Sequence, residues 1–465
     1  MAKDKDSREA RAIDAPGDLG RRVIGKVRIY LFTYIFLGQI FYQFDRSNIG
    51  LANLTMGKEL GLSAQAFGFA SGIFALSAFL MQIPASRAFT RWGPRVWLTG
   101  IMVAWGLVVV AEGFVTNGTQ LTALRFLLGL CEAGFLPGLY VLMSLWLTDR
   151  NHGAAMATLQ MGLAFTNIVG GPLAGWLLSH HLFGLSGWRD LFVIDGCLTV
   201  IWALLSLYFV YDSPEHAHWL NPEERAFMTR YLAEYEAEKK QHGSLERVRF
   251  RQILKDSNIR WLMLAFATTG WIASTFTFFT PTLLKRAAEG ISVQYVGFLL
   301  TGPYIIYAIV AQVWGRHSDR TERHWHSLIP LVWSVLGILL YPVARTPLLA
   351  MLSVCLIQGG TVGFMVNFWP TANMVVGRAT IARSTALINS GMQILSFLGP
   401  IYFGWALDKT GNTNLGMATC VAMLMLNFIL MHTFFVKYKA QQSALANRAY
   451  GAGVESAANP GSVAK

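Results

Sequence analysis

Four ionisable side chains interrupt apolar stretches of this sequence, and their types and spacing could perform proton and anion chemistry. Asp45 and Arg46 are adjacent in FYQFDRSNIG, and Arg125 and Glu132 are seven residues apart in LRFLLGLCEAG. A charge at the centre of a membrane-spanning helix costs at least about 2.5–3.5 kcal/mol, so such residues mark a functional site by default. The alternative is a set of structural ion pairs that hold helices together.

Helix geometry predicts how these four residues can meet. Arg125 and Glu132 lie on one face of a helix, about 10 Å apart along its axis. Gly129 lies between them and leaves space for water, a substrate group or a neighbouring side chain. Because adjacent helical residues point in different directions, Asp45 and Arg46 cannot face the same partner. We expect one of them to approach this space.

The chemistry of these side chains suits transport of an organic anion together with protons. A carboxyl group that is removed from water can load and release a proton near neutral pH as its surroundings change. Arginine stays charged and holds a carboxylate with a planar, two-donor fork. Ser353 and Val354 fall where Arg125 would repeat in the second half of the chain. Proton handling is therefore expected in the first half alone.

Two further acidic residues are given structural interpretations. Asp195, in LFVIDG, has no evident partner in the sequence, so a structural role such as capping a neighbouring helix is favoured. Glu112 stands near the end of an apolar run and is expected to reach the outer interface.

The second half is expected to contribute substrate contacts. Asn367 and Trp369 in one apolar run, and Asn389 in the next, are the candidates. A buried amide needs a hydrogen-bonding partner. Hydrogen bonds between helices are an equal alternative for both asparagines.

Composition excludes a soluble protein. The chain has 465 residues, of which 54% are hydrophobic and 14% are charged, against about 25% charged in soluble proteins. The net charge of +12 is dispersed between long apolar stretches, so a nucleic-acid partner is not expected. The four cysteines have no metal-ligand spacing, so neither a metal site nor a cofactor is predicted. Enzymatic motifs are lacking, and no enzymatic function is predicted.

Hydropathy predicts an all-α membrane protein with twelve spanning helices, each of about 20 apolar residues. The predicted spans are 27–49, 65–87, 95–115, 121–146, 153–178, 190–211, 258–284, 293–315, 327–344, 347–374, 382–406 and 414–437. This pattern divides the chain into a flexible N-terminal tail, a six-helix bundle, a central loop with a short amphipathic helix, a second six-helix bundle and a flexible C-terminal tail. The corresponding ranges are 1–26, 27–211, 212–257, 258–437 and 438–465.

Basic residues orient the array. Most of the 38 lysines and arginines fall on one side when both termini are placed in the cytoplasm, as the positive-inside rule requires. We expect a multi-pass protein of the bacterial inner membrane that acts as a monomer, with both tails and the central loop cytoplasmic.

Two motifs recur at a shared offset. Arg91 and Arg320, each in a short basic loop, are 229 residues apart. Two Gly-Pro segments, Gly171-Pro172 and Gly399-Pro400, are 228 apart, and the tryptophans that follow them, Trp176 and Trp405, are again 229 apart. Unrelated motifs with one offset indicate a duplicated six-helix unit, an architecture of secondary transporters that bind substrate between the halves.

These residues resemble the major facilitator superfamily. The resemblance lies in FDRSNIG, the Arg-x6-Glu pair followed by AGFLPG, the Gly-Pro segments and GRHSDRTERHWH. Within it, the sequence is similar to the anion:cation symporter family of bacterial tartrate, phthalate, galactonate and 4-hydroxyphenylacetate permeases. LTMGKELGLS is most similar to the tartrate and 4-hydroxyphenylacetate members, and the resemblance covers about residues 27–437.

The resemblance implies proton-coupled uptake of an organic acid by alternating access. It implies roles in proton coupling for Asp45 and Glu132, with Arg125 tuning these carboxylates. Arg46 would engage the substrate carboxylate, and Asn389 would contact substrate. Gln43 stands where sugar-acid members have a tyrosine, so an aromatic or small dicarboxylic acid is expected in place of a sugar acid.

The resemblance also implies a conformational latch on the cytoplasmic side. Its first copy contains Arg91, Gly93 and Arg95, and its second copy contains Gly315, Asp319 and Arg320. The first copy has Thr90 where an aspartate is usual and Ser86 in place of its first glycine. We therefore expect the first copy to be the weaker one.

Two other functions stay open. A proton-coupled antiporter that exports a drug or metabolite is one, because Gly171-Pro172 with Gly175 partly matches an antiporter signature. Arg46 and Arg125 favour an anionic cargo over cationic drugs. A transporter-derived membrane sensor is the other, but the central loop and tails hold no evident signalling domain.

Overall fold

The computed structural model describes residues 17–241, 256–287, 290–318, 323–376 and 381–458. Within these ranges, twelve helical segments are long and apolar enough to cross a membrane. The prediction of twelve spanning helices is confirmed.

The first half of the chain forms six spans. Its helices are α2 (Asp18–Glu59), α3 (Ala64–Glu112), α4 (Gly118–Glu132), α5 (Phe135–Trp146), α6 (Asp149–Ser179) and α7 (Gly187–Phe209). α3 contains two spans joined at Gly93, whose φ of 74° and ψ of 163° break the helix. A residue with a Cβ rarely adopts this conformation. α4 and α5 together form one span.

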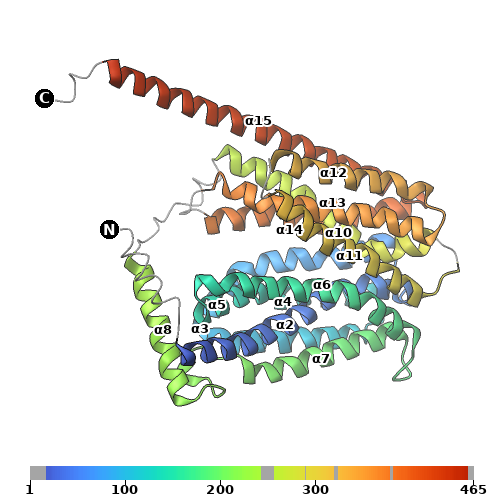
Figure 1. The fold of residues 1–465 in the computed structure, drawn as a ribbon. Coiled ribbons are helices and arrows are strands. Elements are labelled where there is room, and N and C mark those ends of the chain that lie inside the picture. Colours follow the sequence, from blue (N-terminus) through green and yellow to red (C-terminus); the bar gives the residue numbers. More distant parts are fainter. Residues whose placement is uncertain (1–16, 242–255, 288–289, 319–322, 377–380, 459–465) are drawn as a thin grey trace.

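The central segment contains a short 3-10 turn, η1 (Pro214–His216), and the helix α8 (Pro222–Gln241). Asn221 caps the start of α8, because the backbone N–H of Glu224 donates to Oδ1 of Asn221 at 2.8 Å. The Glu224 carboxylate accepts from the Asn221 backbone at 2.9 Å and from Lys26 Nζ at 2.8 Å. Burial raises the pKa of Glu224, but these bonds outweigh it and leave the pKa below its ordinary value. In Figure 1, α8 crosses one end of the bundle beside the start of α2.

The second half forms the other six spans. Its elements are α10 (Ser257–Ala287), α11 (Val293–Ser318), α12 (Arg323–Leu340), η2 (Tyr341–Val343), α13 (Pro347–Asn373), α14 (Ile381–Thr410) and α15 (Asn414–Ala458). Figure 1 shows the two halves as two layers, with α2–α7 in one and α10–α15 in the other.

Two helices extend beyond their predicted spans. α2 begins at Asp18, inside the segment predicted as a flexible tail, and α15 continues beyond residue 437 to Ala458. Hydropathy marks only the apolar part of a helix, whereas the backbone hydrogen bonds continue through polar residues such as Arg21 and Lys26.

The halves meet through close backbone contacts at the end opposite α8. A Cβ built on Gly68 in α3 would lie 2.2 Å from the Pro400 carbonyl oxygen in α14. A Cβ built on Gly297 in α11 would lie 2.4 Å from the Gly171 carbonyl oxygen in α6. Positions 68 and 297 are one 229-residue repeat apart, as are 171 and 400. The two contacts are therefore related by the internal symmetry that the sequence predicts.

One polar contact adds to this closure. The Asp408 carboxylate, near the end of α14, accepts from the backbone N–H groups of Ala64 and Gln65 at 2.9 and 2.8 Å. These N–H groups belong to the first turn of α3, which lacks intrahelical acceptors and favours a negative charge.

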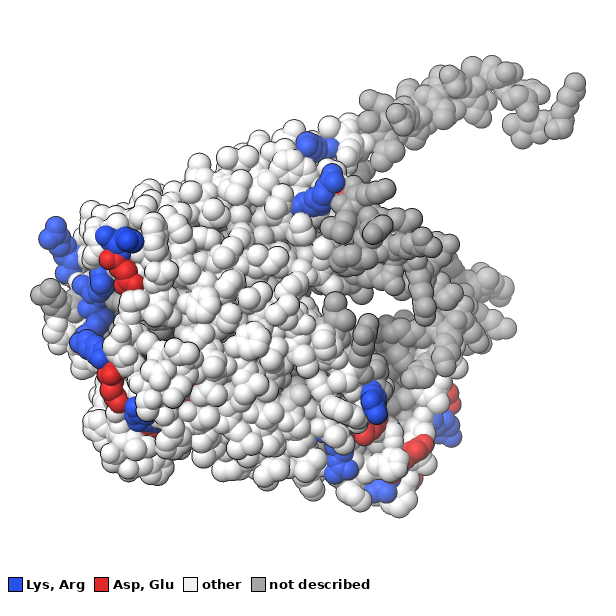
Figure 2. Space-filling model, turned by 180° about the vertical axis from the view of Figure 1, so that it is seen from behind, with Lys and Arg blue, Asp and Glu red and all other residues white. Residues whose placement is uncertain are grey.

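The surface agrees with a membrane location. In Figure 2, the Lys, Arg, Asp and Glu side chains gather at the two ends of the visible face, and a broad uncharged band separates them. Many large apolar side chains are exposed, among them Leu107, Ile201, Leu204 and Phe298. Lipid tails would cover such a band.

Candidate functional site

A central cavity of about 410 Å³ lies between the two halves. It is lined by residues of α2, α3, α5 and α6 on one side and of α10, α11, α13 and α14 on the other. Among the described residues that line it, Arg46 is charged and the others are neutral. The cavity therefore offers one formal positive charge.

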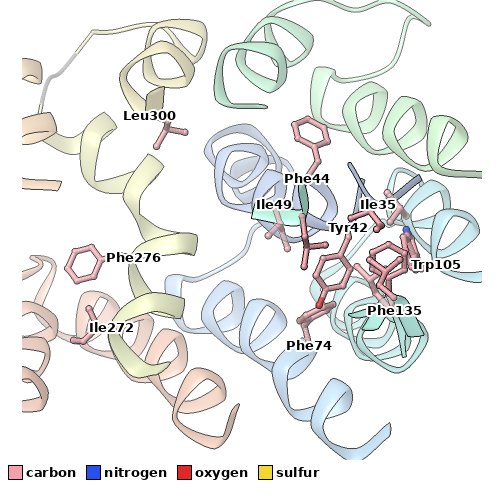
Figure 3. Close-up of a cluster of buried hydrophobic side chains, with 14 of the residues drawn as sticks. Ile35, Tyr42, Phe44, Ile49, Phe74, Trp105, Phe135, Ile272, Phe276 and Leu300 are labelled. Atoms are coloured by element: carbon pink, nitrogen blue, oxygen red, sulfur yellow. The ribbon is translucent and has the colours of Figure 1, made fainter. Parts of the chain in front are cut away.

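The Arg46 side chain is held in place by aromatic neighbours. It donates from Nη1 to the Tyr42 hydroxyl, and its guanidinium lies 4.7 Å from the Phe74 ring centroid. Tyr42 is fixed in turn by Phe135, with ring centroids 5.2 Å apart, and Trp105 packs at the edge of the same group. Figure 3 shows Tyr42, Trp105 and Phe135 packed together, with the Tyr42 hydroxyl pointing toward Phe74. This support leaves Arg46 little freedom to turn away from the cavity.

The predicted residues Asp45, Arg125 and Glu132 come together directly behind this wall. Each is at most 2% exposed, and none of them lines the cavity. Arg125 donates from Nη1 to the Asp45 backbone carbonyl at 3.3 Å, which ties α4 to α2. Neither Glu132 oxygen receives a hydrogen bond from the described residues.

The space expected at Gly129 is filled. A Cβ built there would lie 2.0 Å from Ser77 Oγ and 2.4 Å from the Phe74 carbonyl oxygen. The sequence allowed water, a substrate group or a neighbouring side chain in this space, and the structure places the Ser77 side chain there. Gly129 thus allows α3 and α4 to pack closely.

The expectation that Glu112 reaches the interface is wrong. Its side chain is fully buried, and its Oε1 lies 3.5 Å from Arg125 Nε. Glu112 is the last residue of α3, and that helix packs closely on α4, so the carboxylate points to its neighbour. A position near a helix end in the sequence carried no information about the direction of the side chain.

The statement that Asp195 lacks a partner is also corrected. Asn48 of α2 donates from Nδ2 to the Asp195 carboxylate in α7. The Asp45 carboxyl group lies against that of Asp195. Asn48 and Asp195 are 147 residues apart in the chain, so local sequence could not reveal the contact.

Of the predicted substrate residues, Gln43 and Arg46 line the cavity and three others do not. Asn367 is buried and donates to the backbone carbonyls of His326 and Gly363, so it follows the alternative of bonding between helices. Trp369 packs against Phe266 with ring centroids 5.2 Å apart. Asn389 is half-buried and stands outside the lining.

The second half contributes a neutral polar wall, most of which the sequence analysis missed. Its members are Ser274, Thr277, Tyr304, Tyr307, Gln358, Thr361, Gln393 and Ser396. The repeat offset was the signal that could have found two of them. Ser274 stands 229 residues after Asp45, and Thr361 stands 229 after Glu132.

The first latch copy has a binding partner that the sequence analysis also missed. The backbone N–H of Arg95 donates to Asp212 Oδ1 at 2.9 Å, and Arg95 Nη2 donates to the Leu207 carbonyl at 3.0 Å. A Cβ on Gly93 would approach the same Asp212 oxygen to 2.9 Å. Both contacts lie at the α8 end of the first half.

The other predicted latch residues make fewer contacts. Arg91 is exposed. A Cβ on Gly315, in the last turn of α11, would meet nothing within 4 Å. Asp319 and Arg320 lie outside the described residues. Within the described ranges, no group of three or more His, Cys, Asp or Glu side chains is arranged to hold a metal ion.

Comparison with known proteins identifies one family. The model of the Major Facilitator Superfamily matches residues 35–400 and 286–458. A protein of Agrobacterium vitis named "Putative tartrate transporter" is 31% identical over 417 residues, which cover 89% of this chain and 91% of that one. A quinolone resistance transporter of Acinetobacter baumannii is 29% identical over 428 residues, covering 90% and 94% of the two chains.

A solved structure has the same fold. It is a bacterial homologue of the human lysosomal transporter Spinster, in an inward-facing and occupied conformation. The TM-score is 0.69 at 15% identity, and the match covers 89% of this chain and 97% of that one.

Proposed function

The chain belongs to the Major Facilitator Superfamily of transporters, and we propose that it imports an organic anion together with protons. The observation that carries the proposal is that Arg46 is the single charged side chain among the described residues that line the central cavity. A fixed guanidinium attracts a carboxylate and repels a cation. The relative named as a tartrate transporter supports an organic acid as cargo.

The composition of the cavity narrows the cargo. One carboxylate would pair with Arg46, and a second carboxylate would find no cationic partner among the described lining residues. The second half would hydrogen-bond the rest of the molecule through Tyr304, Tyr307 and Gln358. We therefore favour a monocarboxylate that carries neutral hydrogen-bonding groups over a dicarboxylate.

Proton coupling is assigned to the buried carboxyl groups behind Arg46. Asp45 adjoins Arg46 in α2 and shares the interior of the first half with Glu132 and Arg125. Buried carboxyl groups beside a fixed cation are a common arrangement for proton relays in membrane transporters. Loss of a proton from this group would change the electrostatic potential at Arg46, which links proton occupancy to anion affinity.

We also propose an orientation in the bacterial inner membrane. The excess of basic residues and the positive-inside rule favour the α8 end as cytoplasmic. The glycine contacts between the halves then lie on the outer side. We interpret the structure as closed toward the outside, one of the two states that alternating access requires.

An antiporter that exports drugs is the second candidate, supported by the quinolone resistance relative. The two functions differ in the charge of their cargo and in the direction of proton flow.

Uptake by proteoliposomes would test the proposal, with labelled 4-hydroxyphenylacetate as the monocarboxylate and tartrate as the dicarboxylate. An acidic exterior should drive accumulation of the monocarboxylate, with much less accumulation of tartrate. Arg46→Gln should weaken binding by at least about tenfold, because a charge-assisted bond contributes about 1.5–3 kcal/mol. Arg46→Lys should retain part of the affinity, because it keeps the charge and loses the fork.

Two results would overturn the proposal. One is uptake of the carboxylates tested that does not respond to the pH gradient. The other is gradient-driven exchange of a quinolone, which would establish the antiporter.

A further inference from the structure

The buried interior of the first half contains more acidic groups than cations. Asp45, Glu112, Glu132 and Asp195 are acidic, and each is at most 3% exposed. Arg125 is buried among them, and Arg46 lies beside them at the cavity. If all these groups were ionised, the cluster would carry two uncompensated negative charges, which is strongly unfavourable in a protein interior within a membrane.

The contacts indicate which acidic group is ionised. Arg125 forms an ion pair with Glu112 at 3.5 Å, so Glu112 is compensated. Neither oxygen of Asp45, Glu112 or Glu132 receives a hydrogen bond from a nitrogen or hydroxyl donor among the described residues. Of the three, Glu112 is the one with an ion pair to Arg125. A buried ionised carboxylate without donors is costly, whereas a protonated one is not.

The carboxyl groups of Asp45 and Asp195 form a pair. Asp45 stands one helical turn before Asn48, whose side chain bonds Asp195, so the two carboxyl groups lie against each other between α2 and α7. Two carboxyl groups can hydrogen-bond to each other only if one of them carries a proton. Asn48 donates to one Asp195 oxygen, which fixes the orientation of that carboxylate and favours its charged form.

We propose that Asp195 and Asp45 form a carboxyl dyad that binds one shared proton of the transport cycle, with Asn48 positioning Asp195. With this proton and a second one on Glu132, the cluster becomes electrically neutral. The inference rests on the proposed proton-coupled function and adds Asp195 to the proton-binding groups. Two carboxyl groups that lie against each other cannot both be ionised without a large cost. The dyad therefore releases its proton only when the surrounding charges change.

The charges around Asp195 come from two helices. Asp45 of α2 and Glu112 of α3 face it. α6 also packs on α7, and its residues 151–179 include no Asp, Glu, Lys or Arg. A change in the Arg125–Glu112 pair, or an anion at Arg46, is therefore what alters the field at the dyad.

A small cavity beside Asn48 shares wall residues with the central cavity. Asn48, which bonds Asp195, also lines a small cavity of about 30 Å³ with Ser47, Thr166 and Asn167. This volume exceeds the roughly 10–15 Å³ that one water molecule needs, and its polar groups provide partners. Asn167 also lines the central cavity, so water could carry protons between the two spaces.

The test uses Asp195→Asn in proteoliposomes, with labelled 4-hydroxyphenylacetate as the probe. Asparagine keeps the shape of the Asp195 side chain and can still accept the bond from Asn48. Because an amide does not ionise, it cannot take up or release the proton that Asp195 shares with Asp45. Accumulation driven by a pH gradient should fall at least about fivefold, the lower end of typical coupling between two ligands. Counterflow, an exchange of labelled for unlabelled substrate without net proton movement, should remain within about threefold of wild type.

Asp190→Asn is the matched control. Asp190 is buried in the same helix, α7, but accepts from the Leu182 backbone N–H at 2.7 Å, outside the cluster. This variant should leave accumulation and its pH profile unchanged. Asp195→Glu restores an ionisable carboxyl group and should recover part of the accumulation with a displaced pH profile.

The possible results of this test distinguish failure of the dyad proposal from failure of the proposed proton-coupled function. If wild type accumulates substrate with the gradient and Asp195→Asn does so equally well, the dyad is wrong and the proposed function stands. If accumulation and counterflow fall together in a variant that folds normally, Asp195 is structural and the dyad is also wrong. If wild type itself shows no response to the gradient, the proposed function fails first.

Discussion

The two halves share a backbone plan but differ in their interiors. The symmetric contacts of Gly68 with Pro400 and of Gly297 with Gly171 show how closely the geometry repeats. The charges do not repeat. The residues that stand 229 positions after the five buried ionisable residues of the first half are all uncharged. They are Ser274 after Asp45, Tyr341 after Glu112, Val354 after Arg125, Thr361 after Glu132 and Leu424 after Asp195.

This difference indicates a division of labour. The first half keeps ionisable groups away from lipid and water, next to Arg46. Ser274 and Thr361 in the second half line the cavity as neutral hydrogen-bonding groups. A duplicated scaffold allows this, because the symmetric glycine contacts need only close backbone approach, and the interior of each half can change independently. Three predictions address the comparison.

The strongest contrast is between Asp45 and its counterpart Ser274. Asp45→Asn cannot release a proton, so gradient-driven accumulation should fall at least about tenfold while some substrate binding remains. Ser274→Ala removes one hydroxyl contact and should retain the response to the gradient. Uptake in proteoliposomes, with and without a pH gradient, measures both. An equal loss in both variants would contradict the division of labour.

The glycine contacts should behave symmetrically. Gly68→Ala and Gly297→Ala each force a Cβ against a backbone oxygen, at a cost of about 1–3 kcal/mol to the state closed at this end. Both variants should slow transport, and by similar factors. Gly100→Ala, in the same helix as Gly68, meets nothing within 4 Å and is the control.

Initial uptake rates of monodisperse protein decide this prediction. A loss of transport in only one of the two glycine variants would show that the halves do not close symmetrically.

The smallest effect concerns the attachment of α8 to the first half. Glu224→Gln weakens the bond to Lys26, which is partly exposed, and should loosen α8 by about 0.5–1.5 kcal/mol, the net contribution of a typical hydrogen bond. The folded-state pKa of Glu224 is below its ordinary value. The stabilisation is therefore present above the unfolded pKa and is lost as the pH falls through the folded pKa.

Protection of the α8 amides, which is the slowing of their exchange relative to the intrinsic rate at the same pH, should fall in acid for wild type. The variant should show lower protection at neutral pH with little further change in acid. Exchange in α13, which is remote from α8, serves as the internal reference. Identical exchange of α8 in wild type and variant at neutral pH would exclude this role.

The sequence determined the fold and the family. Apolar runs of about 20 residues predict spans because an unpaired backbone cannot enter lipid, so each crossing segment must be a helix. The repeat offset predicted the two halves, and FDRSNIG with the Arg-x6-Glu pair indicated the superfamily. Asp45, Arg46, Arg125 and Glu132 stood out for one reason, which is that charges in apolar runs are costly.

Tertiary structure decided where these charges act. Side-chain direction depends on helix packing, so Glu112 proved to be buried against Arg125 and Asp195 proved to contact Asn48 and Asp45. Asn367, in contrast, bonds to helix carbonyls and not to the cavity. Hydropathy and spacing describe one helix at a time, whereas electrostatic interactions depend on distances between helices. The cluster of four carboxyl groups could therefore be recognised only after α2, α3, α4 and α7 were placed together.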